Sequence, residues 1–234
     1  MLDQAFEALN TYDWGTDLAV LAPIDDAVLA AHKDAAASGD LEQRLAAVLA
    51  SDASRDAKDY VCRKLMLIGT AASTPALAAL LPEADHSHMA RFALQQFAAP
   101  EAAQALRDAL PKVSGVLKVG VLSSLGARRE AENVAAIAPL LADSDAAVAR
   151  AAALALGAIR SPEASQALAK AKPADAAVQG AVVDASLACA EALLAANKKA
   201  EALAIYKPLA TGNQSKQVRL AATRGMLACA GTKQ

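Results

Sequence analysis

Apolar residues recur along this chain at helical spacing, and the pattern repeats about every 30 residues. Four similar stretches, "RKLMLIG", "MARFALQQFA", "LKVGVLSSLG" and "VARAAALALG", end at Gly69, Ala98, Gly126 and Gly157. Residues one, four and nine positions before each end share one side of a helix, since a helix turns by about 100° per residue. The spacing predicts one helix per repeat, with a buried face made of Ile68, Phe97, Leu125, Leu156, Leu65, Leu94, Leu122, Ala153, Tyr60, Met89, Leu117 and Val148.

A second helix is predicted after each of these stretches, over residues 75–81, 100–110, 134–141 and 162–171. Pro75, Pro100 and Pro162 suit the first turn of a helix, where the missing N–H of proline needs no partner. Thr74 and Ser161 come directly before two of these prolines and are expected to cap the helices. Each repeat is therefore predicted to be a helical hairpin.

The composition agrees with an all-α fold, because hydrophobic residues make up 55% of the chain and aromatic residues only 3%. A core with so few aromatic residues requires helices with small side chains that pack closely. The hairpins are expected to stack into one continuous solenoid. We predict a helical cap over residues 1–40, repeats over 41–171 and further repeats over 172–234. The exposed end of the stack is expected to be covered by Phe6, Leu9, Trp14, Leu18 and Leu21.

A basic residue recurs six to eight positions before each repeat end, at Arg63, Arg91, Lys118 and Arg150. Stacked repeats would align these side chains in a column that reaches acidic or carbonyl groups of neighbouring turns. Candidate acidic partners lie just upstream, and we expect a structural ladder rather than the alternative, a basic stripe for an anionic ligand. These acids are Asp59, Asp85, Asp143 and Asp145.

The stretch "DSDAAVARAAALALGAIRSPEASQAL", residues 143–168, resembles a HEAT repeat of the short, phycobilisome-lyase-like kind. This resemblance implies a right-handed alpha-alpha superhelix, in which the Asp and Arg positions, here including Arg150, are structural. Arg63 and Lys118 lie one residue out of that register. The stretch "LACAEALLAANKKAEALAIYKPLA" is more similar to a tetratricopeptide unit, with a turn near Asn197.

Few residues suggest metal or thiol chemistry. The segment Asp85-His86-Ser87-His88 is the one candidate metal site, but residues two apart do not share a helix face. A helix start capped by Asp85 or Ser87 is the favoured interpretation, and His32 is the only other histidine. We expect neither a metal nor a cofactor. The three cysteines are widely spaced among small apolar residues, which indicates buried thiols: Cys62, Cys189 and Cys229.

Charge and hydropathy argue against two further classes, nucleic-acid-binding proteins and membrane-spanning proteins. The net charge of -2 argues against a nucleic-acid partner, which a basic surface would attract. The longest apolar runs are shorter than the roughly 20 residues of a membrane span. The first residues, "MLDQAFEALN", do not resemble a signal peptide, so we expect a soluble protein that is cytoplasmic, or exported if a signal has been removed.

The repeats predict a function in binding rather than in catalysis. We expect a non-catalytic scaffold that binds a protein partner on the concave face of the solenoid. The alternative is a chaperone similar to bilin or tetrapyrrole lyases, or an accessory domain of a larger enzyme.

Far-ultraviolet circular dichroism tests the secondary structure. Because helical spacing runs through the chain, the spectrum should be that of a helical protein with negligible sheet. A strand content near the globular average of about 20% would contradict the repeat interpretation.

Overall fold

The structure is a computed structural model that describes residues 1–33 and 38–231. All its regular elements are helices, and no strand occurs in these two ranges. The all-α fold built of helical hairpins is thus confirmed. The chain forms two compact units, unit 1 from Met1 to Ser124 and unit 2 from Leu125 to Gln234. The division at residues 40 and 171 stays a prediction.

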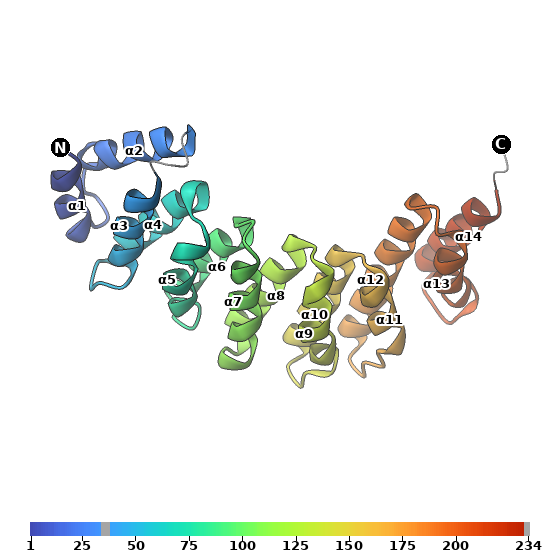
Figure 1. Ribbon diagram of the computed structural model, residues 1–234. Helices are drawn as coiled ribbons and strands as arrows, with labels where there is room; N and C mark the ends of the chain where they lie inside the picture. The colour runs from blue at the N-terminus through green and yellow to red at the C-terminus, as the bar shows by residue number, and fades with distance from the viewer. Residues whose placement is uncertain (34–37, 232–234) are drawn as a thin grey trace. The chain divides into compact units, whose positions relative to one another are not determined.

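The described residues of unit 1 form seven α-helices and most of an eighth, and Figure 1 labels them along the chain. Helices α4 and α6 pack against each other in one layer, whereas α3, α5 and α7 pack in sequence in the other. The helices are α1 (Leu2–Asn10), α2 (Ala22–Lys33), α3 (Ser38–Leu49), α4 (Arg55–Ile68), α5 (Thr74–Ala79), α6 (Ser87–Gln96), α7 (Pro100–Ala109) and α8 (Gly115–Arg128). Short 3-10 turns lie at Leu18–Leu21, Ala71–Ser73 and Leu110–Lys112.

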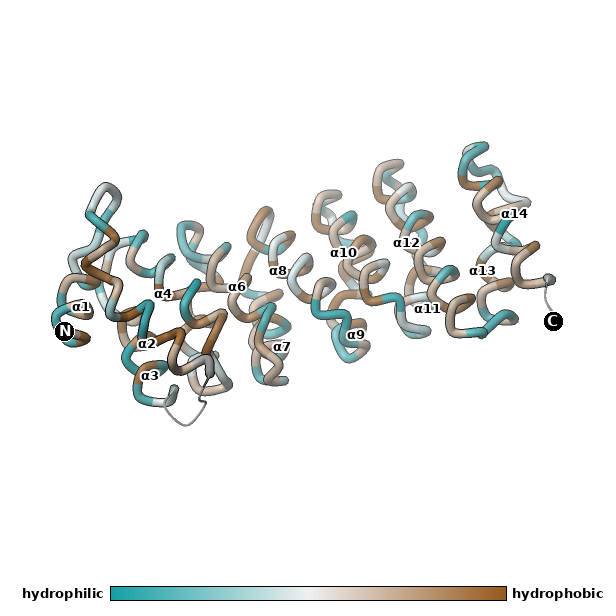
Figure 2. The backbone as a smooth tube through the Cα atoms, turned by 90° about the horizontal axis from the view of Figure 1, so that it is seen from above, coloured by the Kyte–Doolittle hydropathy of each residue, from teal (hydrophilic) through white to brown (hydrophobic). Residues whose placement is uncertain are grey.

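Unit 2 continues the same alternation of helices. Figure 2 shows α10, α12 and α14 side by side in one layer and α9, α11 and α13 in the other. The helices are α9 (Val134–Ile137), α10 (Ala146–Ile159), α11 (Pro162–Lys170), α12 (Ala176–Ala195), α13 (Lys199–Thr211) and α14 (Lys216–Ala230). Pro139 lies in a 3-10 segment, Ala138–Ala142, which continues α9. Another 3-10 turn, Ala131–Asn133, precedes α9.

The helical face predicted from the sequence forms the core. Ten of its twelve residues are buried, and the remaining two, Met89 and Leu117, are partly buried. The expected turn near Asn197 is also present, between α12 and α13, where Asn197 has a φ of 59°. Periodicity alone was sufficient here because burial depends mainly on which side of a helix a residue occupies.

The predicted helix starts are confirmed in part. Pro75, Pro100 and Pro162 occupy first turns, and the Ser161 side chain caps α11 by accepting a hydrogen bond from the Ala164 N–H. The prediction for Thr74 is wrong, because Ser73 is the N-cap and Thr74 is the first residue of α5. The preceding 3-10 turn, Ala71–Ser73, already leads the chain into the helix.

Two glycines at the repeat ends allow helices to approach closely in unit 2. A Cβ atom on Gly126 would lie 2.7 Å from Ala155 Cα, and one on Gly157 would lie 2.8 Å from Ala185 Cα. Real Cβ atoms do not approach backbone so closely, so larger residues would force these helices apart. Both glycines lie inside their helices, and their role is close packing rather than helix termination.

Helix α12 is long and apolar enough to span a membrane by length and composition alone. It packs against α10, α11, α13 and α14, however, and buries Val178, Ala185 and Leu193 among other residues. Its apolar composition is accounted for by this central position in unit 2.

Of the five residues expected to cover the end of the stack, three are buried, and the prediction is wrong for Trp14 and Leu18. Phe6, Leu9 and Leu21 are buried, whereas Trp14 is 90% exposed and Leu18 is 58% exposed. Trp14 lies in a loop that turns at Gly15, whose φ is 89°, so the indole is held away from the helices.

A polar contact joins the N-terminal segment to the first repeat. The Tyr60 hydroxyl on α4 donates a hydrogen bond of 2.6 Å to Asp25 on α2, and Lys64 forms an ion pair with the same carboxylate. Burial and the hydrogen bond to Asp25 raise the pKa of Tyr60. The phenol therefore remains a neutral donor that ties α2 to α4.

The packing role of Gly157 is tested by comparing it with Gly180, which also lies inside a helix but has no neighbour that a Cβ would meet within 4 Å. Gly157→Ala should lower the free energy of unfolding by about 1–2 kcal/mol, because the added methyl group overpacks the contact with Ala185. Gly180→Ala should raise it by about 0.5–1 kcal/mol through helix propensity. Urea denaturation measures both, and stabilisation by both changes would contradict the close contact.

Candidate functional site

The candidate site is a stripe of residues on α4, α6 and α8 of unit 1, most of them exposed, which we call the binding face. Each helix contributes the residues ten, six and two positions before its repeat end, which is Gly69, Ala98 or Gly126. These positions form one stripe because residues four apart are neighbours on a helix. Three large apolar side chains are exposed on it: Leu67 by 51%, Phe92 by 37% and Val116 by 83%. Arg63, His88 and Gln96 are also exposed, Asp59 is partly buried, and Gly120 and Ser124 are buried beneath the α8 end of the stripe.

Arg91 on α6 reaches from beside this stripe to the next helix. Its Nη1 group donates a hydrogen bond of 3.2 Å to Ser124 Oγ on α8, and its Nη2 lies 2.8 Å from His88 Nδ1. Since arginine has only donors, this imidazole nitrogen must be the acceptor. A Cβ atom on Gly120 would lie 2.6 Å from Arg91 Nε, so glycine leaves the space that the guanidinium occupies.

The electrostatic environment of Arg91 is unusual. Burial lowers the pKa of its guanidinium, yet no carboxylate in the described part of the chain pairs with it. Both of its hydrogen-bond partners, Ser124 and His88, are neutral in this arrangement. A partly desolvated cation is normally paired with an acid. Arg91 differs, because neutral groups hold it in place and no negative charge compensates its own.

The remaining basic residues of the predicted column have different surroundings. Arg63 is exposed on α4. Burial raises the pKa of nearby Asp59, and the charges of Arg55 and, to a smaller extent, Arg63 oppose this rise. Lys118 is partly buried on α8. Arg150 is exposed on α10, and no hydrogen bond or ion pair joins it to a described residue.

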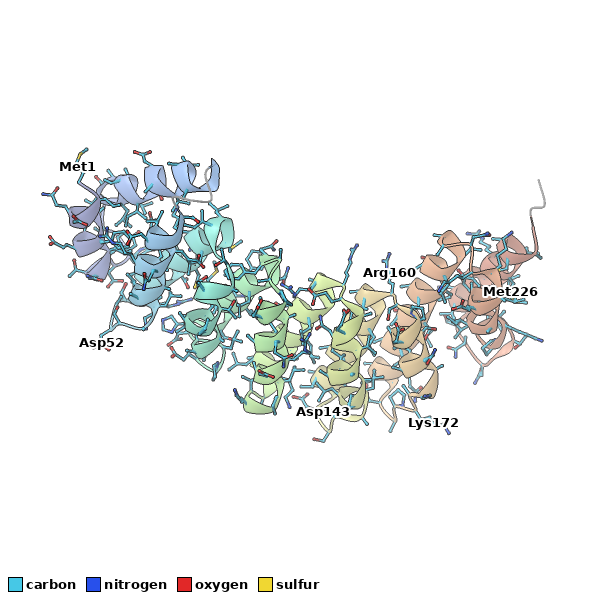
Figure 3. The ribbon with its side chains drawn as sticks, viewed as in Figure 1. Met1, Asp52, Asp143, Arg160, Lys172 and Met226 are labelled. Carbon is cyan, nitrogen blue, oxygen red and sulfur yellow. The ribbon has the colours of Figure 1, made fainter. Side chains whose placement is uncertain are left out.

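The two acids predicted for unit 2 bind backbone groups before α10. Asp143 Oδ1 accepts a hydrogen bond from the Asp145 N–H, and Asp145 Oδ1 accepts one from the Ala147 N–H as the N-cap of α10. Asp143 and Lys172, which Figure 3 labels at the turns of unit 2, both line an open cavity of about 610 Å³. A ladder that includes Asp143, Asp145 and all four basic residues stays a prediction.

The two histidines of the candidate metal segment have different partners. His86 Nδ1 lies 2.9 Å from Glu83 Oε2, whereas His88 bonds to Arg91 and stacks on the Phe92 ring at 6.3 Å. Among the described residues, no group of three metal-ligating side chains comes together. A helix does begin at Ser87, but its N-cap is His86, so the expected capping by Asp85 or Ser87 is wrong. The side chain of His32 lies outside the described residues.

The cysteines have the environment expected of structural thiols. Cys62 and Cys189 are buried, and Cys229 is partly buried. Burial raises the pKa of the Cys62 thiol to about 12 and that of Cys189 to about 11. A thiol with such a pKa is a poor nucleophile near neutral pH.

Comparison with known proteins agrees with the repeats found in the sequence and the fold. Residues 113–187, which include α8 to α11 and the first part of α12, match the HEAT repeat family. This part of the chain therefore consists of HEAT repeats. No curated protein matches it.

Two solved structures resemble the chain over almost its whole length. One is the CpcE–CpcF complex of phycocyanin lyase from a Nostoc species, with 22% identity, coverage of 98% of this chain and 94% of that chain, and a TM-score of 0.44. The other is human deoxyhypusine hydroxylase in complex with glycerol, with 15% identity, coverage of 98% and 96%, and a TM-score of 0.37.

The different surroundings of Arg91 and Arg150 predict different effects on stability. Arg91→Gln should lower the free energy of unfolding by about 1–2 kcal/mol, because Ser124 and His88 lose their donor. Arg150→Gln should change it by less than about 0.5 kcal/mol. Urea denaturation of both variants measures the difference, and equal losses would instead support a continuous ladder.

Proposed function

We propose that this chain is a non-catalytic scaffold that binds a protein partner through the exposed faces of stacked helices. The observation that carries the proposal is the binding face, where Leu67, Phe92 and Val116 are exposed beside basic side chains. Apolar residues interspersed with arginine are typical of protein interfaces, because aromatic and arginine side chains supply much of the binding energy.

The repeat architecture supports the same function. Stacked hairpins present the side chains of successive helices on one extended surface, and a partner can therefore contact several repeats at once. Two titratable groups near the binding face have structural surroundings: Cys62 is buried, and His86 pairs with Glu83.

The second candidate function is that of a chaperone similar to bilin or tetrapyrrole lyases, or of an accessory domain in a larger enzyme. An open groove of about 460 Å³ in unit 2 favours the first of these, because it would take an apolar ligand. Leu168, Val182, Ile205 and Leu209 are among its lining residues. A bilin or haem bound there would give visible absorbance after incubation and gel filtration, whereas a scaffold would give none.

The scaffold proposal is tested by recovering partners with the tagged full chain and measuring the affinity of each purified partner. Leu67→Glu places a charge on the binding face and should weaken binding at least tenfold. Leu203→Glu on α13 is the matched control, since Leu203 is a 37% exposed leucine away from that face, and should change the affinity less than twofold.

Circular dichroism and melting temperatures establish that both variants fold. Partners that bind wild type and Leu67→Glu equally would overturn the assignment of the binding face. Failure to recover any specific partner, together with visible absorbance of a bound tetrapyrrole, would favour the chaperone function instead.

A further inference from the structure

Arg91 is distinguished from a surface arginine by how it is fixed. A guanidinium carries five N–H groups, and those of Arg91 make two hydrogen bonds within the described chain, to Ser124 on α8 and to His88 on α6. The side chain thus lies across two successive repeats, in the space left by Gly120. Further N–H groups remain without an acceptor among the described residues, and this leaves donor capacity for a bound molecule.

We infer that Arg91, together with His88 and Phe92, anchors a carboxylate side chain of an extended, acidic segment in the partner protein. This inference rests on the proposed scaffold function and names the chemistry of the partner. Arg91 supplies the positive charge, and the exposed Phe92 ring, which lies parallel to the His88 ring with centroids 6.3 Å apart, supplies an apolar surface on the same helix. The partner segment is therefore expected to carry Asp or Glu next to an aliphatic or aromatic residue.

The charge distribution favours an acidic partner. The negatively charged Asp59 carboxylate lies near Arg63, whereas Arg91 has no carboxylate partner in the described structure. A cation that is already partly desolvated loses less hydration when an anion binds, so the ion pair gains more than one at a fully exposed site.

The number of charges favours a carboxylate over a phosphate. One uncompensated guanidinium matches a single negative charge and can bind a carboxylate through parallel N–H donors. A phosphate carries nearly two charges at neutral pH and is usually bound by several basic groups. A phosphorylated segment is therefore an alternative outcome of the test.

The position of Arg91 is held before any partner arrives. The contacts to Ser124 and His88 restrict a long side chain that would otherwise lose rotamer freedom on binding. Gly120 permits this position, because a methyl group there would displace the guanidinium from α8. Gly120→Ala should therefore weaken binding although it keeps the charge and favours the helix.

The test selects peptides from a displayed random library against the full chain and synthesises the selected sequences with amidated C-termini. Selected peptides should carry Asp or Glu next to an apolar residue. Replacing that acid by its amide, or introducing Arg91→Gln, should weaken binding at least tenfold. Arg107→Gln on α7 is the control, with the same change of charge on the other layer of unit 1, and should change the affinity less than twofold.

A double-mutant cycle decides whether the two groups meet. Once Arg91 is replaced by Gln, changing the peptide acid to its amide should have less than a threefold further effect. Gly120→Ala should weaken binding several-fold, and its melting temperature should fall no further than that of Arg91→Gln, because helix propensity offsets part of the lost hydrogen bonding. Since this variant keeps the positive charge, it separates positioning from net charge.

The results separate this site from the scaffold function. If peptides bind through Leu67 but are indifferent to Arg91 and to their own acids, the scaffold stands and the carboxylate site is refuted. A requirement for phosphorylated residues, or loss of binding in Arg107→Gln equal to that in Arg91→Gln, would also refute it. Selection of no peptide, together with no effect of Leu67→Glu on any recovered partner, would overturn both proposals.

Discussion

Helices α10 and α12 lie so close that a methyl group on Gly157 would collide with the backbone of Ala185, and Gly126 meets Ala155 in the same way. Alanine-rich helices gain little from each buried side chain, so their stability depends on dense packing between backbones. Unit 2 depends on this close approach, because a larger residue at either glycine would separate neighbouring helices and open the core behind them.

Close packing also determines how polar residues are used. Short connections leave the first N–H groups of each helix without partners, and acidic or hydroxyl side chains at the turns satisfy them. Asp145, Ser161, Asp175 and Ser215 all cap helices of unit 2 in this way. Acids that cap helix starts lie at the turns, away from the basic residues in the middle of the helices.

A buried acid in unit 1 acts in a similar way. Glu42 on α3 is 3% exposed and accepts hydrogen bonds from the backbone N–H groups of Thr70 and Ser73, which lie in the turn before α5. The same separation of charges leaves Arg91 with neutral partners on the binding face. The requirements of the fold therefore produce the local charge on which the proposed carboxylate site depends.

The sequence by itself determined the helical repeats, their buried faces and the cap at Ser161, because these depend on spacing along one helix and on its nearest turn. It did not determine that Thr74 lies inside its helix, that Trp14 is held away from the core, or that Arg91 bonds to Ser124 and His88. A long side chain can reach groups on several neighbouring helices, and only the packed structure decides which of these groups, and how much water, surround it.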